Sequence, residues 1–327
     1  MKRAAASLLV LVIWFAAAVA AESQQTAKIA RIGFITGASR EASYFDTFRG
    51  TLEKLGHVEG KNISFEYRSA QGRGPEHTAE LARELVRQNV DVLVATPLPA
   101  IRAAKEATQT MPIVMITSAD PVASGLIESL ARPGANITGT TRLVRELSSK
   151  RLELLKEVVP SISRIGILQA EEAITVEADF KRYEAAARAL SLQLQSVRLP
   201  TANPDISGMF GAAAKNRIDA IIAVSYGVLN RHAKRIADLA IQSRMPVMFE
   251  RSVFTEWGGL VSYSANESES YRRAAVHVDK ILKGTKPADI PVERPTEFEF
   301  VINLKTAKRL GLTIPQSVLY RADKVIQ

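Results

Sequence analysis

Two series of alternating apolar runs and amphipathic stretches follow each other along the sequence, and this repeated alternation limits the fold more than any other feature. The apolar runs are short, and helical periodicity fills the stretches between them. Continuous apolar runs of this length are typical of parallel strands that are covered by helices on both faces. The pattern therefore predicts an α/β protein built on parallel sheets.

The first series predicts four strands and three helices before residue 120. We expect strands at 31–36, 63–68, 90–96 and 112–117, and helices at 44–55, 75–88 and 98–108. Pro75 suits the first turn of its helix, because the N–H that proline lacks would have no partner there. The stretch GANITGTT, residues 134–141, follows and is typical of an extended segment that leaves this unit.

The alternation then begins again at a similar scale. We expect helices at 148–158, 175–190, 204–215 and 229–242, with strands at 164–168, 192–199, 219–225 and 246–250. The stretch 258–264, a helix at 267–283, a strand at 297–304 and a short helix ending at Leu310 complete the chain. Two such series in 327 residues predict two similar lobes of ordinary domain size.

We expect the chain to cross between the lobes three times, near 139–144, 262–267 and 289–296. The reason is that a strand remains after the last long helix, so the chain has to return to the second lobe. The first lobe would then hold residues 28–142 and 267–284, and the second lobe residues 143–263 and 292–327.

Residues 1–21 have the features of a cleavable secretory signal. Lys2 and Arg3 precede the apolar run ASLLVLVIWFAAAVA, whose small residues predict cleavage before Ala21 or Glu22. An uncleaved anchor is the alternative, but the run is short for a membrane span of about 20 residues. No cysteine follows, which excludes a lipid anchor. We expect an exported soluble protein, periplasmic in a Gram-negative cell.

Composition excludes several other classes of protein. The chain contains no cysteine, so disulfides, thiol nucleophiles and zinc–thiolate sites are ruled out. The formal charge is +9, and removal of Lys2 and Arg3 with the leader lowers it by two, to about +7. The basic residues are interleaved with acids along helical stretches such as LARELVRQ. This pattern indicates solvated helix faces, and we expect no nucleic-acid partner.

Polar residues follow the predicted strands, at the edge where open α/β sheets hold their ligands. Helix starts come soon after, and their free N–H groups would point into the same cleft. One alternative is that Ser118 or Asp120 only caps a helix that Pro121 begins. Across six strand ends we favour a ligand cleft; the residues concerned include Thr36, Ser39, Thr96, Pro97, Thr117, Asp120, Gln169, Ser225, Tyr226, Glu250 and Arg251.

No catalytic or metal-binding motif accompanies these polar residues. The four histidines, at 57, 77, 232 and 277, lack the spacing of metal ligands, and there is no P-loop, nucleophile elbow or GxGxxG sequence. Glu171 and Glu172 are adjacent and would point apart. Two lobes around a polar cleft without a nucleophile, a base or a metal favour a binding protein over an exported enzyme.

Four stretches resemble the ABC transporter substrate-binding proteins related to tryptophan- and tyrosine-binding proteins; these are residues 54–72, 116–141, 257–268 and 281–326. The resemblance extends over essentially the whole chain after the leader, and KPADIPVERPT with FVINLKTAKRLGL is its most specific part. It implies a type I periplasmic-binding-protein fold with two Rossmann-like lobes and a three-strand hinge. It also implies a small ligand such as tryptophan, phenylalanine or tyrosine, a partner permease and ATPase, and no cofactor.

On this resemblance we expect the ligand to lie between two faces. The first face comprises Thr36, Ser39, Tyr44, Thr96, Pro97, Thr117, Asp120 and Pro121, and the second comprises Gln169, Ser225, Tyr226 and Glu250. Hydroxyls and N–H groups of the first lobe would take an amino acid's carboxylate. Asp120 or Glu250 would take its ammonium group. Tyr44 and Tyr226 would cover its side chain, with ordinary packing as the alternative.

One departure from the family pattern concerns the turn QAEEAI, residues 169–174, where relatives often carry an Asn-Pro-rich turn. Glu171 or Glu172 in this turn would favour a cationic or amine-bearing ligand. The leading hypothesis is a monomeric solute receptor of an importer, whose closure around the ligand is read by the permease. The alternative is a receptor of the same fold that signals to a membrane kinase or chemoreceptor; a neighbouring permease gene would favour import.

Overall fold

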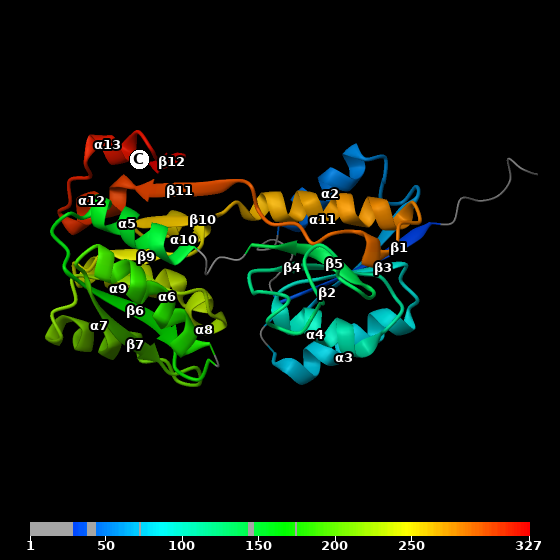
Figure 1. Cartoon of the computed structure of the whole chain (residues 1–327), viewed down its shortest axis with the longest axis horizontal. Coiled ribbons are helices and arrows are strands. Elements are labelled where there is room, and N and C mark those ends of the chain that lie inside the picture. The colour runs from blue at the N-terminus through cyan, green and yellow to red at the C-terminus, as the bar shows by residue number, and fades with distance from the viewer. Residues whose placement is uncertain (1–28, 38–43, 72, 143–146, 174) are drawn as a thin grey trace, which may run out of the picture.

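Two lobes, each with its own sheet, lie side by side in the computed structural model (Figure 1), which describes residues 29–37, 44–71, 73–142, 147–173 and 175–327. The first sheet has the strand order β2-β1-β3-β4-β5, and the second has the order β12-β11-β10-β9-β8-β6-β7. Neighbouring strands are parallel except for β10 and β11, which are antiparallel. The predicted α/β class with parallel sheets is confirmed.

The first sheet is made of the strands expected from the first series and one more. Its strands are β1 (Ala30–Thr36), β2 (Ile63–Ser69), β3 (Val92–Ala95), β4 (Ile113–Thr117) and β5 (Ile137–Thr141). The helices between them are α2 (Phe45–Lys54), α3 (Pro75–Arg87) and α4 (Leu98–Ala107). Helix α2 covers one face of the sheet, whereas α3 and α4 cover the other, and the buried side chains form a separate apolar cluster on each face.

The segment predicted only as extended is the edge strand β5. Gly139 has a φ of 139° and lies opposite Met115 of β4. A Cβ at this position would lie 2.0 Å from the carbonyl oxygen of Met115, so only glycine allows β5 to approach β4 this closely.

The second sheet contains the remaining strands. They are β6 (Arg164–Ala170), β7 (Gln193–Leu199), β8 (Ala220–Ala223), β9 (Val247–Phe249), β10 (Val261–Ala265), β11 (Phe298–Asn303) and β12 (Lys324–Ile326). Its helices are α5 (Ser148–Val158), α6 (Val176–Ala189), α7 (Ile206–Lys215), α8 (Gly227–Arg231), α9 (Ala233–Gln242), α10 (Ser252–Glu256), α12 (Leu304–Leu310) and α13 (Gln316–Leu319). The helix predicted at 229–242 is two helices that meet at His232, and both bury residues in one apolar cluster.

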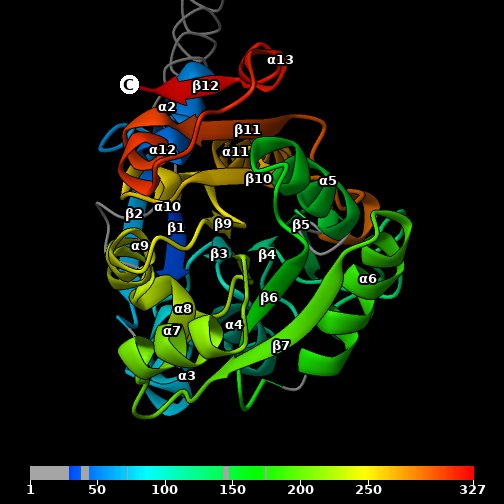
Figure 2. The ribbon, with the colours of Figure 1, turned by 90° about the vertical axis from the view of Figure 1, so that its left-hand side faces the viewer.

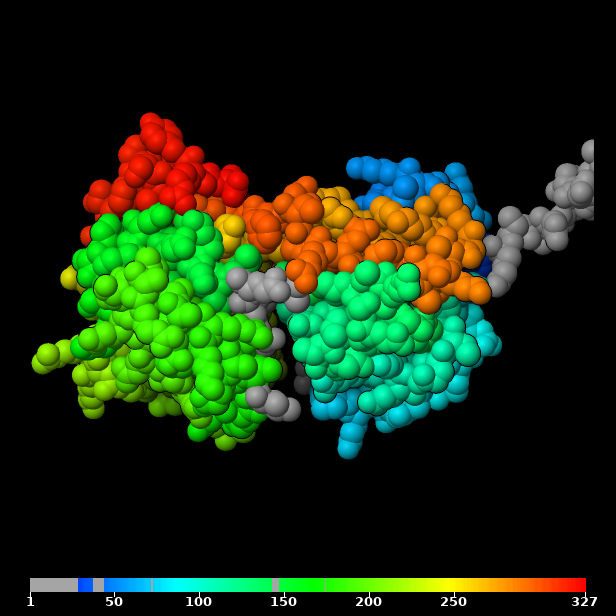
Figure 3. All heavy atoms as spheres, in the orientation of Figure 1, coloured from blue at the N-terminus to red at the C-terminus, as the bar shows by residue number. Residues whose placement is uncertain are grey.

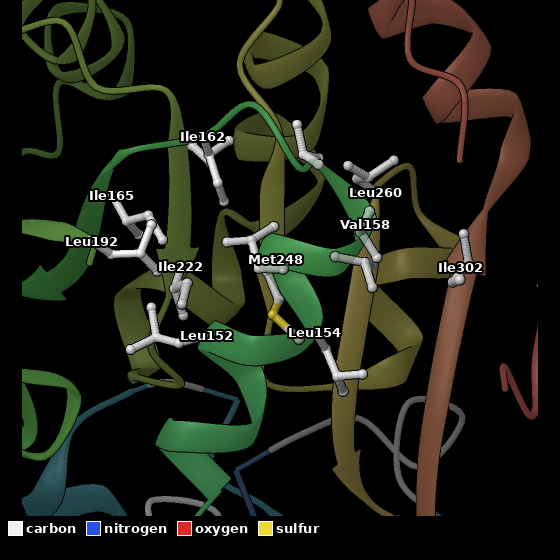
Figure 4. Packing of buried hydrophobic residues seen from close by; sticks show 14 of the residues in the cluster. Leu152, Leu154, Val158, Ile162, Ile165, Leu192, Ile222, Met248, Leu260 and Ile302 are labelled. Atoms are coloured by element: carbon white, nitrogen blue, oxygen red, sulfur yellow. The ribbon is translucent and has the colours of Figure 1, made fainter. Parts of the chain in front are cut away.

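Helices cover both faces of the second sheet (Figure 2). Helices α5 and α6 lie on one side, and α7, α8 and α9 lie on the other. Figure 4 shows the first of these interfaces, where Leu152, Leu154 and Val158 of α5 face apolar residues of the sheet and its edges, among them Ile165, Ile222, Met248, Leu260 and Ile302. Burying each large aliphatic side chain contributes roughly 1.5–3 kcal/mol, so this interface fixes α5 on the sheet.

Three segments connect the two sheets. The chain passes from β5 to α5, from β10 to α11 (Glu267–Leu282), and from α11 through the short helix η2 (Pro287–Asp289) to β11. Helix α11 packs against α2, β4 and β5, so it belongs with the first sheet although the strands before and after it lie in the second. The first and third connections touch, since Thr141 N donates to Glu293 O at 3.0 Å.

The residue limits given for the lobes stay a prediction about domain boundaries. The expected leader at 1–21 and residues 143–144 of the first expected crossing lie outside the described residues. Within the described ranges, no helix is long and apolar enough to span a membrane.

A candidate ligand site between the lobes

Charged and aromatic side chains from both lobes meet beside the connections. Arg142 follows β5, Tyr44 precedes α2, Glu267 and Tyr271 lie at the start of α11, and Arg251 follows β9 of the second sheet. We call these five residues the hinge cluster. Because the cluster joins residues that follow strands of both sheets, the carboxyl edges of the two sheets face each other across it. Figure 3 shows the groove that separates the two halves of the molecule.

Glu267 is the centre of the hinge cluster. Arg251 binds it through two hydrogen bonds, from Nε to Oε1 at 2.6 Å and from Nη2 to Oε2 at 2.8 Å. Arg142 pairs with the same Oε1 through Nη1. The Glu267 side chain is only 5% exposed. Burial by itself would raise the pKa of Glu267, but the charges and hydrogen bonds of the two arginines outweigh it and lower this pKa to about 2.

The two tyrosines of the cluster lie against each other and against Glu267. Their ring centroids are 5.5 Å apart and the rings are inclined by 40°. Burial, and then the charge of Glu267, raises the pKa of Tyr44 to about 12. The same two causes raise the pKa of Tyr271, whose hydroxyl also bonds to the Thr96 side chain. Both hydroxyls are therefore neutral near pH 7 and keep a proton to donate.

The second lobe contributes a polar group at the ends of β6 and β8. Asp179 of α6 is 2% exposed and accepts hydrogen bonds from the hydroxyl of Tyr226 and, at 2.8 Å, from Oγ1 of Thr175. Ser225 Oγ bonds to the side chain of Asn230. The predicted residues Ser225 and Tyr226 are half-buried, and Tyr226 is oriented by a carboxylate that sequence reasoning did not select.

Glu250, a predicted ligand contact, lies inside the second lobe. Its carboxylate is 2% exposed, and Oε1 accepts from Nη1 of Arg151 at 2.7 Å and from the hydroxyl of Tyr183 at 3.1 Å. Oε2 accepts from the backbone N–H of Ser225 at 2.7 Å. Both oxygens are engaged inside the second lobe, so Glu250 is not placed to receive a ligand's ammonium group.

Gln169, another predicted ligand contact, is also buried in the second lobe. Its side chain is fully buried, Nε2 donates to the carbonyl of Val176 at 2.7 Å, and Oε1 accepts from Ser196 Oγ at 3.4 Å. These bonds fasten the start of α6 to β6 and leave no surface for a ligand. Glu172, which we expected to attract a cationic ligand, accepts from the backbone N–H of Thr201 at 2.9 Å and thereby holds the turn after β7.

Asp120 and Thr117 make the bonds of turn residues. Oδ1 of Asp120 accepts from the N–H groups of Val122 and Ala123 at 2.9 and 3.1 Å. Oγ1 of Thr117, a buried side chain, accepts from the N–H of Ala119 at 3.0 Å. The residues after Pro121 form turns rather than the helix that the capping alternative assumed. The bonds of Asp120 agree with that alternative in substance, since the side chain caps backbone N–H groups.

The remaining predicted residues of the first lobe have different environments. Thr36 is buried at the end of β1, and Pro121 is buried in the turn after β4. Thr96 precedes Pro97 through a cis peptide bond and contacts the hinge cluster through Tyr271. Ser39 lies outside the described residues.

Sequence reasoning assigned only Tyr44 of the hinge cluster to the two ligand faces, and it named Arg251 only among the polar strand-end residues. Arg251 stood at a strand end, beside the residue that was chosen instead. Arg142 follows the extended segment. Glu267 and Tyr271 lie at the start of a helix that was predicted to return to the first lobe, and this prediction was the signal that could have placed them near the cleft. Among the described residues, no group of three or more histidine or acidic side chains could hold a metal ion.

Comparisons with known proteins show the family of the chain. A family model described as "ABC transporter substrate binding protein" matches residues 28–326. The tyrosine-binding protein of Clostridioides difficile (strain R20291) is 26% identical over 268 residues, which are 81% of this chain and 75% of that protein.

Two solved structures are similar over almost the whole chain. A conserved domain protein from Vibrio cholerae has a TM-score of 0.81 and 28% identity, with 91% of this chain and 100% of that chain covered. An ABC domain in complex with L-Trp from Streptococcus pneumonia has a TM-score of 0.78 and 26% identity, with 91% and 99% covered. The predicted resemblance and the type I periplasmic-binding-protein architecture are both confirmed.

Proposed function

The chain belongs to the ABC transporter substrate-binding protein family, and from this premise we propose that it is the solute receptor of an importer that binds an aromatic amino acid or a close analogue. The observation that carries the proposal is the hinge cluster, because it combines two tyrosine rings with charged groups at the junction of both lobes. The family is one of solute-binding proteins, so the chain is not an enzyme.

The chemistry of the cluster suits an amino acid with a flat side chain. Tyr44 is half-buried and presents aromatic surface, on which a ring packs with about 0.5–1.5 kcal/mol beyond simple burial, and the buried Tyr271 supports the Tyr44 ring. The arginines and Glu267 lie beside these rings and offer partners for charged main-chain groups. The relatives named above bind tyrosine and tryptophan according to their descriptions, and this supports the same ligand class here.

The cellular setting follows from the leader and the family. The sequence features of residues 1–21 support export and cleavage, and we propose a periplasmic monomer without a lipid anchor. Closure of the lobes around the ligand would create the surface that an inner-membrane ABC permease reads. A receptor that signals to a membrane kinase or chemoreceptor remains the second candidate, and uptake of labelled ligand with and without this gene distinguishes the two.

Binding is tested with the exported chain after removal of any ligand that copurifies. Melting is measured with L-tryptophan, L-tyrosine and L-phenylalanine, and with L-alanine, L-glutamate and L-lysine as controls. A ligand at about 100 times its dissociation constant adds ~2.7 kcal/mol of stability, which is readily seen as a shift in melting temperature. We expect a shift with at least one aromatic amino acid. No shift with any of the three would overturn the proposal.

A further inference from the structure

We propose that the hinge cluster is a carboxylate-binding subsite, in which Arg142 and Arg251 hold the ligand's α-carboxylate beside Glu267. This inference rests on the proposed function, because it assigns one group of the proposed ligand to named residues. It differs from the sequence-based expectation, which gave the carboxylate to hydroxyls and N–H groups of the first lobe.

The cluster has one positive charge in excess. Two guanidinium groups share a single carboxylate, and the exposed fractions of the Arg142, Arg251 and Glu267 side chains are only 16%, 24% and 5%. A charge removed from water needs a partner, and one carboxylate neutralises only one of the two cations. A second carboxylate would complete the balance.

A hydrogen-bond donor is also left over. Nε of Arg142 is buried and has no hydrogen-bond partner within the part of the chain that the structure describes. Buried polar groups are nearly always paired, and an orphaned donor next to a shared carboxylate indicates a partner supplied by a ligand. The guanidinium presents its donors in a planar fork that matches both oxygens of a carboxylate.

The other groups around the cluster do not supply the missing negative charge. The tyrosine hydroxyls keep their protons, because burial and Glu267 disfavour phenolates at this place. Glu299 affects the pKa of Tyr44 less than Glu267, Arg251 and Arg142 do, and Glu299 also interacts with Lys324. The excess charge therefore remains for a ligand.

The position of the cluster connects carboxylate binding to lobe closure. Arg251 comes from the second sheet, Arg142 lies on the first connection, and Glu267 begins the helix that packs on the first sheet. A carboxylate held by both arginines would bridge the two lobes at the hinge, where a small displacement is amplified at the outer rim. Asp179 and Glu250, two buried carboxylates of the second lobe, already have partners and do not neutralise the excess positive charge of the hinge cluster.

The first experiment compares ligands that differ in one charged group. Calorimetry is done with L-tryptophan, indole-3-propionate, which lacks the ammonium group, and tryptamine, which lacks the carboxylate; the tyrosine series is run in parallel. We expect tryptamine and tyramine to bind roughly thirtyfold or more weakly than the parent amino acids, because they leave the cationic cluster unpaired. The propionates should lose less affinity than the amines. Equal losses of affinity for the amines and the propionates, or no binding by any member of either series, would overturn the subsite.

The second experiment uses Arg142→Gln with Arg272→Gln as its control. Arg272 lies on α11, is 43% exposed and pairs with Glu297 at 3.3 Å, so the control removes the same charge from the same lobe. We expect Arg142→Gln to weaken L-tryptophan and indole-3-propionate by roughly thirtyfold while leaving tryptamine unchanged. Arg142→Lys should restore part of the affinity, and melting of each unliganded variant reports its folding.

The outcomes separate this inference from the proposed function. Binding of an aromatic amino acid with the same affinity in Arg142→Gln would leave the receptor function standing and remove the subsite. Binding of the propionate in an Arg142-dependent manner, without binding of the amino acid, would keep the subsite and contradict the proposed ligand class.

Discussion

Two centres in this protein combine arginine with glutamate, but they differ in charge balance and in exposure. In the second lobe, Arg151 and Glu250 are 0% and 2% exposed and form a one-to-one pair at 2.7 Å. Tyr183, Ser225 and the carbonyl of Tyr263 make further hydrogen bonds to the pair. In the hinge cluster, two arginines share one glutamate and the arginines keep access to solvent.

Charge balance distinguishes the Arg151–Glu250 pair, which we call the brace, from the hinge cluster, which is the proposed binding site. A fully buried pair with equal charges, whose carboxylate oxygens are both engaged, leaves no charge for a ligand to neutralise. Glu250 and Arg251 are neighbours in the chain, and the extended backbone at Arg251 sends the two side chains to opposite sides. One enters the brace and the other enters the hinge cluster, so a single strand end serves both centres.

The largest expected effect comes from breaking the brace. Glu250→Gln leaves Arg151 buried without its counter-charge, and we expect the free energy of unfolding to fall by about 3–5 kcal/mol. Urea denaturation of the unliganded protein measures this loss. The control is Glu157→Gln, which breaks an exposed pair with Arg321 and should cost less than about 1 kcal/mol. Similar losses in the two variants would contradict the brace.

The decrease in unfolding free energy at acid pH, which we call the acid limb, tests the hinge cluster. The pKa of Glu267 falls from 4.5 in the unfolded chain to about 2 in the fold, so its contribution is complete above pH 4.5 and disappears as the pH falls toward 2. The shift corresponds to about 3 kcal/mol. Glu267→Gln should remove this part of the pH dependence, measured as unfolding free energy between pH 5 and 2. An unchanged acid limb in the variant would show that the arginines do not hold this carboxylate.

A smaller effect distinguishes a tyrosine of the brace from one of the cluster. Tyr183→Phe removes a hydroxyl that donates to Glu250, a hydrogen bond to a charged group, and should cost about 1.5–3 kcal/mol of stability without changing ligand affinity. Tyr271→Phe removes a bond to the neutral Thr96 and should cost about 1 kcal/mol. Chemical denaturation and calorimetry are compared for both variants. The opposite order would mean that the hinge cluster, not the brace, is the more tightly bonded centre.

The smallest effect concerns Asp120. Asparagine caps backbone N–H groups about as well as aspartate, so Asp120→Asn should change neither melting temperature nor ligand affinity measurably. Calorimetry with the ligand identified by the melting screen provides the check. A loss of roughly thirtyfold in affinity would return this carboxylate to the site as the partner of the ligand's ammonium group.

Most of the fold could be predicted because its signals are local. The apolar runs and helical periods gave most elements of both sheets; the split at His232, the strands β5 and β12 and the short helices α10 and α13 were not predicted. The site was harder to predict. Of the strand-end residues, Gln169 and Glu250 turned inward and Asp120 closed a turn, and the sequence around them looks no different from that of residues facing a groove.

The sequence by itself determined the two α/β series and the family. Strand and helix periods repeat within a few residues, so neighbours along the chain suffice to define them. The partners of the carboxylates were decided only by the tertiary structure. Glu250 pairs with Arg151, which lies 99 positions earlier in the chain. Glu267 pairs with Arg142 of the first connection and with Arg251 of the second lobe. Whether a charge is paired or left in excess depends on which distant side chains the fold brings within hydrogen-bond reach.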